Sequence, residues 1–364
     1  MNETECAEKN EGYDNARFAL VVYIGTPVAF LGTVFNGILL IIFCHKKSLN
    51  SPDFYLLFLA IFDMLICVLY IPFFTMDALA IYYQIKSLHH LWHTYVMQIY
   101  CMSRFVQFGA VYMMLCATFE RFVYISSKRC LSWFITDNGR LITAIVALVI
   151  SLIFRFPTFF DYKIVYRANC PPFQVLKLDY LFLPMLMSYP LYTKFNFYMM
   201  SIVQTILPFI LLTCFNIVII YLTHKRLYKT SHSMKFYMLG FTNVIRQESK
   251  NRKIHQELKY ATRTMVAIVF TYLTCNVFSV FMSVLENVFP ESSMLVDNYG
   301  SSTKFYTMAA DLVSILVVLN SLLRMTVHMI CNPQFRERFK LLLIKFSSCW
   351  IPVAISNQAR DNNS

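Results

Sequence analysis

Charged residues interrupt a chain that is otherwise strongly apolar, and the clearest group is Glu120-Arg121-Phe122 at the end of a long apolar run. Charged side chains within a membrane-spanning segment are costly and usually functional, because they pair with one another or line an internal pathway. An adjacent carboxylate and guanidinium favour ion pairing at the membrane edge. The alternative is that Arg121 simply extends to the lipid headgroups.

Other apolar runs carry polar or helix-breaking residues at similar depths. These are Asn36, Asp63 within Leu59-Ala60-Ile61-Phe62-Asp63, Pro208, Asn216 and Asn320-Ser321. A carboxylate in a hydrocarbon environment needs hydrogen-bond partners, and amide side chains supply them. We therefore expect Asn36 and Asn320 to lie beside Asp63.

Long apolar segments must position these residues. Hydrophobic residues make up 57% of the 364-residue chain and charged residues 14%, against about 25% charged in average soluble proteins. Runs of roughly 20 apolar residues cross a bilayer as helices. Seven such runs occur, over residues 18–44, 54–80, 95–125, 141–160, 196–223, 264–289 and 304–331. The sequence predicts an all-α membrane protein with seven spans, and charged pairs four residues apart over 248–257 predict that the sixth helix continues beyond its span.

The net charge of +12 predicts the orientation of these spans. With the N-terminus outside, the outer segments are net negative and the inner segments carry most of the Lys and Arg, as the positive-inside rule requires. The sequon at Asn2 agrees, because N-glycosylation marks the outer side. The expected organisation is an extracellular N-terminus over 1–17, a bundle over 18–331 and a cytoplasmic helix and tail over 332–364. A nucleic-acid partner is not needed to explain the charge.

The set of polar residues within the spans resembles the rhodopsin-like G protein-coupled receptors. Local runs are similar to the FMRFamide-receptor-like branch of invertebrate neuropeptide receptors, and they comprise Phe156-Pro157-Thr158-Phe159-Phe160-Asp161, Cys275-Asn276, Glu286, Val318-Leu319-Asn320-Ser321 and Pro333-Gln334-Phe335-Arg336. The resemblance implies a plasma-membrane receptor without enzymatic activity or cofactor. Its expected partners are an amidated peptide ending in Arg-Phe, a heterotrimeric G protein and membrane lipid.

The resemblance also implies roles for particular residues. Glu120, Arg121, Phe122, Asp63, Asn36 and Asn320 are expected to act in activation and G protein coupling, and a disulfide is expected between Cys170 and either Cys101 or Cys6. Arg324 stands where the family has Tyr, and Phe278 stands where it has the proline of the sixth span. Ala110 and Leu316 replace polar residues that the family uses around a sodium ion. A sodium ion at Asp63 and a carboxylate held by amides therefore both stay open.

One face of the third span connects its two ends. Residues at spacings of three and four share a helix face, and here they are Arg104, Gln107, Val111, Met114, Thr118 and Arg121. The two arginines are about 25 Å apart along a helix. We expect a ligand pocket beside Arg104 and Gln107, and a G protein contact at Arg121.

Four carboxylates lie near the outer ends of the spans, at Asp77, Asp161, Glu286 and Asp311. A carboxylate can bind the guanidinium of a peptide arginine with two hydrogen bonds, and we assign this role to Asp77 and Glu286. Asp311 is less certain as a pocket residue, because it lies about 180° around the helix from Asn320. The alternative is that these carboxylates pair with Arg104, Arg155 and Lys304 and never contact a ligand.

The segment after the last span predicts a short amphipathic helix on the membrane surface over 333–345. Phe335, Phe339, Leu342 and Phe346 follow spacings of four and three, which places them on one face. Cys349 follows this helix and is a candidate for palmitoylation, although an unmodified cysteine also fits.

Other functions fit the sequence less well. A chemosensory receptor of the same fold for small molecules is the main alternative. A transporter or channel predicts internal repeats or several charged pore residues, and an enzyme predicts a metal-ligand cluster, a phosphate-binding loop or a nucleophile–base pair. None of these patterns occurs in the sequence. His89, His90 and His93 are expected to be surface residues of a short outer loop rather than metal ligands.

Overall fold

The computed structural model describes residues 14–44, 54–126, 129–160, 162–166, 173, 176–180, 198–237, 245–290, 292–297 and 302–344. Seven helices in this part of the chain are long and apolar enough to cross a membrane. They cover Asn15–Cys44, Phe54–Tyr82, Lys86–Ser126, Asp137–Phe159, Tyr198–Lys225, Lys259–Val288 and Lys304–Cys331. The predicted spans are therefore confirmed, and the third begins at Lys86 rather than at residue 95.

The spans are assembled from the following elements. The first two contain α1 (Asn15–Phe18), η2 (Ala19–Gly25), α2 (Thr26–Cys44), α3 (Phe54–Tyr70), η4 (Ile71–Thr75) and α4 (Met76–Tyr82). The next two contain α5 (Lys86–Ser126), α6 (Asp137–Arg155) and η6 (Phe156–Phe160), and η5 (Arg129–Ile135) lies between these two spans. The last three contain η7 (Ile202–Ile206), α8 (Leu207–Tyr237), α9 (Ile245–Val288) and α10 (Lys304–Cys331). Between η6 and η7, β1 (Tyr162–Tyr166) pairs antiparallel with β2 (Leu176–Tyr180), with Tyr162 opposite Tyr180.

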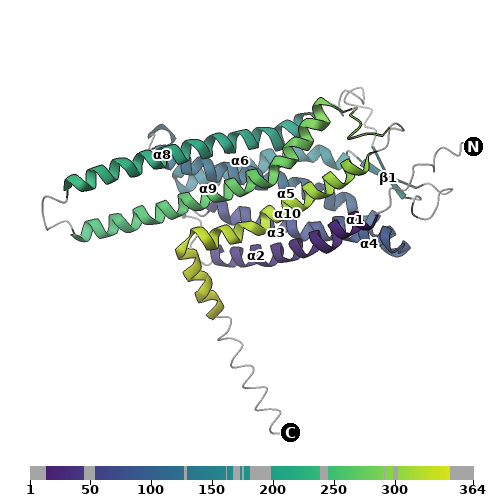
Figure 1. The fold of residues 1–364 in the computed structure, drawn as a ribbon, viewed down its shortest axis with the longest axis horizontal. Coiled ribbons are helices and arrows are strands. Elements are labelled where there is room, and N and C mark those ends of the chain that lie inside the picture. Colours follow the sequence, from purple (N-terminus) through teal and green to yellow (C-terminus); the bar gives the residue numbers. More distant parts are fainter. Residues whose placement is uncertain are drawn as a thin grey trace, which may run out of the picture.

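The long helices form a closed ring in which each packs against its neighbours, in the order α2, α3, α5, α8, α9 and α10, and α10 returns to α2. The remaining helix, α6, packs on α5 (Figure 1). The centre of the ring is filled by fully buried apolar side chains from successive helices, including Leu39, Tyr55, Met113, Leu212 and Ile268. Two helices, α8 and α9, continue past the others at one end, the left in Figure 1. The start of α9 at Ile245 confirms the predicted continuation of the sixth helix.

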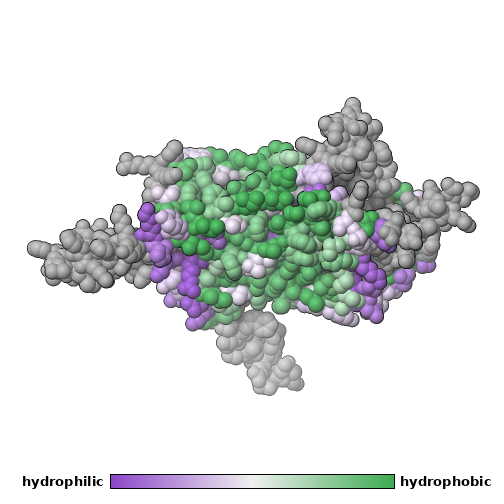
Figure 2. Space-filling view, turned by 45° about the horizontal axis from the view of Figure 1, so that its top comes forward, coloured by the Kyte–Doolittle hydropathy of each residue, from purple (hydrophilic) through white to green (hydrophobic). Residues whose placement is uncertain are grey.

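The outer surface of the bundle is apolar across its middle. Figure 2 shows a broad hydrophobic band between two polar rims. Large apolar side chains on this surface include Phe30, Ile153, Ile217, Phe270 and Ile330, each more than half exposed. Such a continuous apolar belt would aggregate in water and is solvated by lipid tails, so the chain has the surface of a multi-pass membrane protein.

Three spans contain a π-helical turn close to a proline. η2 ends two residues before Pro27, η4 contains Pro72, and η7 ends two residues before Pro208. A proline lacks an N–H and its ring clashes with the carbonyl one turn earlier, and a wider turn relieves that clash. In contrast, α9 carries Phe278 instead of a proline and remains a single α-helix from Ile245 to Val288.

Side chains from neighbouring helices bind the carbonyl oxygens of these π-helical turns. The Tyr70 hydroxyl donates to Val21 O (3.3 Å), Tyr95 to Pro72 O (3.2 Å) and Tyr112 to Val203 O (3.1 Å), and Trp92 Nε1 donates to Phe73 O (3.0 Å). Within a membrane, backbone groups must be satisfied by the protein itself. Three of these four donors lie on α5, so this helix supports the irregular turns of two other spans.

A further helix over residues 333–344 follows α10. Phe335 is buried and its ring lies 5.3 Å from that of His328 and 6.2 Å from that of Phe43. This contact attaches the start of the helix to α10 and α2. Leu341 and Ile344 on its later turns are exposed.

Candidate functional site

The predicted face of α5 lies toward the interior over its second half. Met114, Thr118 and Arg121 are all buried, and the Thr118 hydroxyl donates to Met114 O at 2.7 Å within the helix. Gln107 and Arg104 are half-buried nearer the other end. The two ends of this face are called the Arg121 end and the Arg104 end below. The face thus runs from a closed end to a partly open end.

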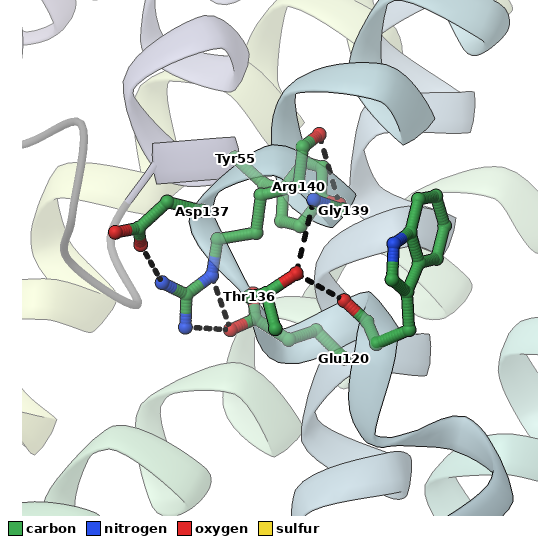
Figure 3. Close-up of polar contacts among 7 residues, drawn as sticks. Tyr55, Glu120, Thr136, Asp137, Gly139 and Arg140 are labelled. Atoms are coloured by element: carbon green, nitrogen blue, oxygen red, sulfur yellow. Dashed lines mark hydrogen bonds and ion pairs between the residues drawn. The ribbon is translucent and has the colours of Figure 1, made fainter.

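At the Arg121 end, Glu120 forms an ion pair with Arg140 of α6. Arg140 donates to Glu120 Oε1 from both Nη2 (2.8 Å) and Nε (3.0 Å), and both side chains are buried (Figure 3). A third hydrogen bond joins Arg140 Nη1 to Asp137 Oδ1 at 3.3 Å, but the Asp137 side chain is 53% exposed. The carboxylate of the Glu120-Arg121-Phe122 motif therefore ties α5 to α6.

Local structure at the start of α6 fixes the position of Arg140. Thr136 is the N-cap: its hydroxyl accepts from Gly139 N (3.2 Å) and donates to Trp133 O (2.7 Å). A side chain at Gly139 would overlap the Trp133 carbonyl, so this close turn requires glycine. Arg140 lies one residue further along, and its carbonyl accepts a hydrogen bond from Tyr55 of α3 at 3.3 Å. Three helices, α3, α5 and α6, therefore meet at Arg140.

Arg140 belongs to none of the motifs that the sequence analysis identified. A signal was present in the spacing: Asp137 and Arg140 are three residues apart at the beginning of an apolar run, where an arginine points back into the bundle edge. Of the other motif residues, Arg121 is buried and Phe122 packs against Phe215 of α8, with ring centroids 5.6 Å apart.

The centre of the bundle contains a second charged pair. Asp63 is fully buried; it accepts a hydrogen bond from the Ser321 hydroxyl at 2.9 Å and forms an ion pair with Arg324 Nη1. Both partners lie on α10. Arg324 is the residue that departs from the resembled family, and its guanidinium balances the charge of the Asp63 carboxylate. A sodium ion at Asp63 would have to compete with this tethered cation.

The amides expected beside Asp63 have other partners. Asn36 Nδ2 donates to Gly32 O (2.8 Å) and to Ser321 O (3.0 Å), so Asn36 binds the backbone of α10 next to the residue that holds Asp63. Asn320 is buried, and its Oδ1 accepts no hydrogen bond from the described residues. The expectation that these amides bind Asp63 directly is wrong, because the carboxylate binds Ser321 and Arg324 instead.

At the Arg104 end, residues from three helices converge on Glu286. The Tyr306 hydroxyl of α10 hydrogen-bonds to the Glu286 carboxylate of α9, and Arg104 of α5 interacts with it electrostatically. The Arg104 guanidinium also lies 5.1 Å from the centre of the Tyr100 ring, which is within cation–π range. Gln107 Nε2 donates to Ser103 Oγ at 3.2 Å along α5. Arg104, Glu286 and Tyr306 thus form a polar cluster that is only partly buried.

The other two carboxylates have different surroundings. Asp311 is buried and accepts a 2.6 Å hydrogen bond from Arg17 Nε, which joins α1 to α10. Asp77 is half-buried on α4 and interacts electrostatically with Tyr95 of α5. Asp311 therefore anchors the start of the first span. Asp77 and Glu286 each interact with a residue of α5, Asp77 with Tyr95 and Glu286 with Arg104. A role for either residue in ligand binding stays a prediction.

Several predicted sites lie outside the described residues: the sequon at Asn2, the palmitoylation candidate Cys349, and Asp161, Cys6 and Cys170. Cys101 is described and is buried in α5. Among the described residues no disulfide bond is present, and both expected pairings involve Cys170. The disulfide, glycosylation and palmitoylation therefore remain predictions.

Comparisons with known proteins give no family assignment. No family model matches the chain, and a search of curated proteins finds no match either. The case for a function therefore depends on the geometry of the described side chains.

Proposed function

We propose that the protein is a rhodopsin-like G protein-coupled receptor at the cell surface, with its N-terminus outside and its C-terminus in the cytoplasm. Its ligand binds at the Arg104 end and a heterotrimeric G protein binds at the Arg121 end. The observation that carries this proposal is the face of α5, which connects a partly open polar cluster around Arg104 to the buried Arg121, the neighbour in sequence of the Glu120 that pairs with Arg140.

The proposed ligand is an amidated peptide ending in Arg-Phe. The Glu286 carboxylate already lies within electrostatic range of a guanidinium, that of Arg104, so it offers a negative charge to a second one. A peptide arginine would bind Glu286 and Asp77 and would replace Arg104 as the main positive charge acting on Glu286. That exchange changes the charge balance on α5 directly, and it gives the ligand a differential interaction with two states of the bundle.

The proposed response to the ligand is a movement of α5 relative to its neighbours. Glu120 and Arg140 hold α5 against α6 in the present state, and Asp63 and Arg324 hold α3 against α10. Both pairs are buried, so each has one preferred geometry rather than many. A state that binds G protein through Arg121 would rearrange the first of these pairs.

The helix over 333–344 is proposed to lie on the cytoplasmic membrane surface. Phe335 fixes its first turn, and Phe339 and Leu342 on the same predicted face are half-buried, so this face lies toward the bundle and the lipid interface. This arrangement supports the predicted amphipathic helix and the lipid as a partner.

The test is expression with a promiscuous G protein and a panel of amidated Arg-Phe peptides, with the same peptides as free acids for comparison. A calcium response to an amidated peptide is expected, with its potency reduced at least about tenfold in both Asp77→Asn and Glu286→Gln receptors, since each loses a charge-assisted hydrogen bond of about 1.5–3 kcal/mol. Surface expression is measured for every variant.

Two results would contradict the proposal at different levels. Unchanged potency in both variants would remove the assigned ligand contacts. No response to any peptide from a receptor present at the surface would remove the peptide class, and a response to small molecules instead would establish the chemosensory alternative.

A further inference from the structure

Two histidines at the start of α5 differ from their predicted environment. His89, His90 and His93 were expected on the surface of a short loop, but all three lie within α5 (Lys86–Ser126). His90 is exposed, whereas His89 and His93 are each only 6% exposed. The helix continues past the apolar run, and its first turns pack against other residues, so the expectation of a surface loop is wrong.

His89 and His93 form a close pair on one helix face. They are four residues apart, the spacing at which side chains on an α-helix lie one above the other. Their ring centroids are 4.3 Å apart. Trp92 packs on His93 at 4.9 Å, and Phe173, from the segment between α6 and η7, packs on His89 at 5.3 Å. The pair is therefore held between two aromatic rings.

The hydrogen bonding of His93 fixes its tautomer. His93 Nδ1 lies 2.8 Å from the backbone carbonyl of His89. A carbonyl oxygen can only accept, so Nδ1 of His93 must carry a proton, and in the neutral ring the lone pair is on Nε2. Histidines that bind metals in proteins usually donate their other ring N–H to a carbonyl or carboxylate in this way. Among the described residues, no side chain or backbone group hydrogen-bonds to the ring of His89.

We propose that His89 and His93 bind a divalent transition-metal ion, with Zn²⁺ and Cu²⁺ as the favoured ions. Imidazole nitrogens bind such ions at about 2.0–2.1 Å, and two rings tilted by 54° to each other and one helical turn apart can both reach one ion. Hard ions such as Mg²⁺ and Ca²⁺ require oxygen ligands and are excluded by this donor set. In the described part of the chain no third His, Cys, Asp or Glu joins the pair, so the described residues supply two ligands.

The site is independent of the proposed peptide ligand. It lies on the first two turns of α5, well before Arg104, and its occupancy can be measured with no agonist and no G protein. In the proposed orientation the site lies at the extracellular side and would bind metal ions from there. Failure of the receptor proposal would leave the metal proposal intact, and the reverse also holds.

The first experiment uses the unmodified full chain, purified with a tag that contains no histidine and reconstituted in lipid nanodiscs. One equivalent of Cu²⁺ is added, and electron paramagnetic resonance detects the ligand nitrogens. The expected spectrum shows superhyperfine coupling to two imidazole nitrogens. This measurement needs no variant, so misfolding cannot confuse it. A spectrum with a single nitrogen, or with none, would overturn the two-histidine site.

The second experiment titrates Zn²⁺ by calorimetry into the unmodified protein and into His89→Gln, His93→Gln and His90→Gln. His90 is the matched control, since it lies on the same turn but is exposed and about 100° around the helix from His89. Removal of a second-shell group typically weakens metal binding about 10–100-fold, so loss of either ligand should weaken it at least as much. His90→Gln should change the affinity by less than about twofold, which is well below that range.

Thermal unfolding of each variant is measured without metal, to check that the fold is retained. Equal Zn²⁺ affinity in the unmodified protein, His89→Gln and His93→Gln would overturn the proposal, as would an equal loss in His90→Gln. Mg²⁺ is titrated under the same conditions, and binding of Mg²⁺ with a similar affinity would also contradict a site built from two imidazoles.

Discussion

Asp63 of α3 and Arg324 of α10 form an ion pair in the centre of the bundle, with side chains only 1% and 5% exposed. Ser321 binds the same carboxylate, and the Ser321 carbonyl accepts a hydrogen bond from Asn36 of α2. Three helices are thereby joined through one acidic side chain. Buried pairs of this kind are costly to desolvate, so their partners depend strongly on one another.

This dependence gives the first prediction. Asp63→Asn leaves the Arg324 charge buried without its carboxylate, and Arg324→Gln leaves the Asp63 charge without its cation; each should cost about 3–5 kcal/mol of stability. The double variant removes both charges, so its loss of stability should be smaller than the sum of the losses in the two single variants. Unfolding of all four proteins in nanodiscs completes the cycle, and simple addition of the two costs would show that the residues are not coupled.

The two carboxylates that bind Arg140 give a matched comparison. Glu120 is buried and Asp137 is 53% exposed, so Glu120→Gln should cost about 3–5 kcal/mol while Asp137→Asn should cost about 0–1 kcal/mol. Thermal unfolding checks both. For the proposed receptor, Glu120→Gln should also raise the signalling activity measured without ligand, because α5 is released from α6. Equal effects of the two substitutions would mean that burial of the pair does not matter.

The sequence predicted the seven spans because length and hydropathy determine them almost alone. It failed at the start of α5, where Lys86, His89 and His93 interrupt the apolar pattern although the helix continues. Hydropathy detects the part of a helix that lies in lipid, and it does not detect turns that lie beyond the membrane and pack against other segments. The two buried histidines of that region were therefore assigned to a loop.

Pairings between distant residues were harder to predict than the residues themselves. Asp63 and Arg324 were both noticed in the sequence, one as a buried acid and one as a departure from the resembled family. Their contact depends on the rotation of α10 about its axis and on its depth relative to α3, which residue spacing along a single helix does not determine. The same holds for Glu120 and Arg140, and for the pairing of Asp311 with Arg17.

Close packing of α2 against α3 gives a prediction about glycine. A side chain at Gly32 would overlap Cys67 Sγ, whereas the position of a side chain at Gly37 has no neighbouring atom within 4 Å. Gly37→Ala should be neutral or stabilise the helix by up to about 1 kcal/mol, because alanine is the better helix former. Gly32→Ala should destabilise by about 1–3 kcal/mol through overpacking. Unfolding temperatures of the two variants compare them directly, and a stabilised Gly32→Ala protein would mean that α2 and α3 can separate without cost.

The π-helical turn η7, which directly precedes α8, depends on a hydrogen-bond donor from α5. In η7, Leu207 N–H bonds to Ile202 O five residues earlier, so the next carbonyl, that of Val203, would require an N–H from Pro208, which has none. Tyr112 supplies that donor at 3.1 Å. Tyr112→Phe should therefore cost about 1–3 kcal/mol and speed amide exchange around η7, since it leaves a partly buried carbonyl without its donor. The control is Tyr221→Phe on the lipid-facing side of α8, where the ring is 63% exposed and no change is expected.

The distribution of charge predicts the orientation, and this can be tested without any ligand. Two epitope tags are compared, one at the N-terminus and one in the segment between α8 and α9. The segments that contain most of the Lys and Arg are predicted to lie in the cytoplasm, so antibody should stain intact cells only through the N-terminal tag and should reach the second tag only after permeabilisation. Asn2→Gln should remove a glycan and increase mobility on a gel while leaving that pattern unchanged. Staining of the second tag on intact cells would reverse the orientation, and it would place Arg104 on the cytoplasmic side, where a secreted peptide has no access.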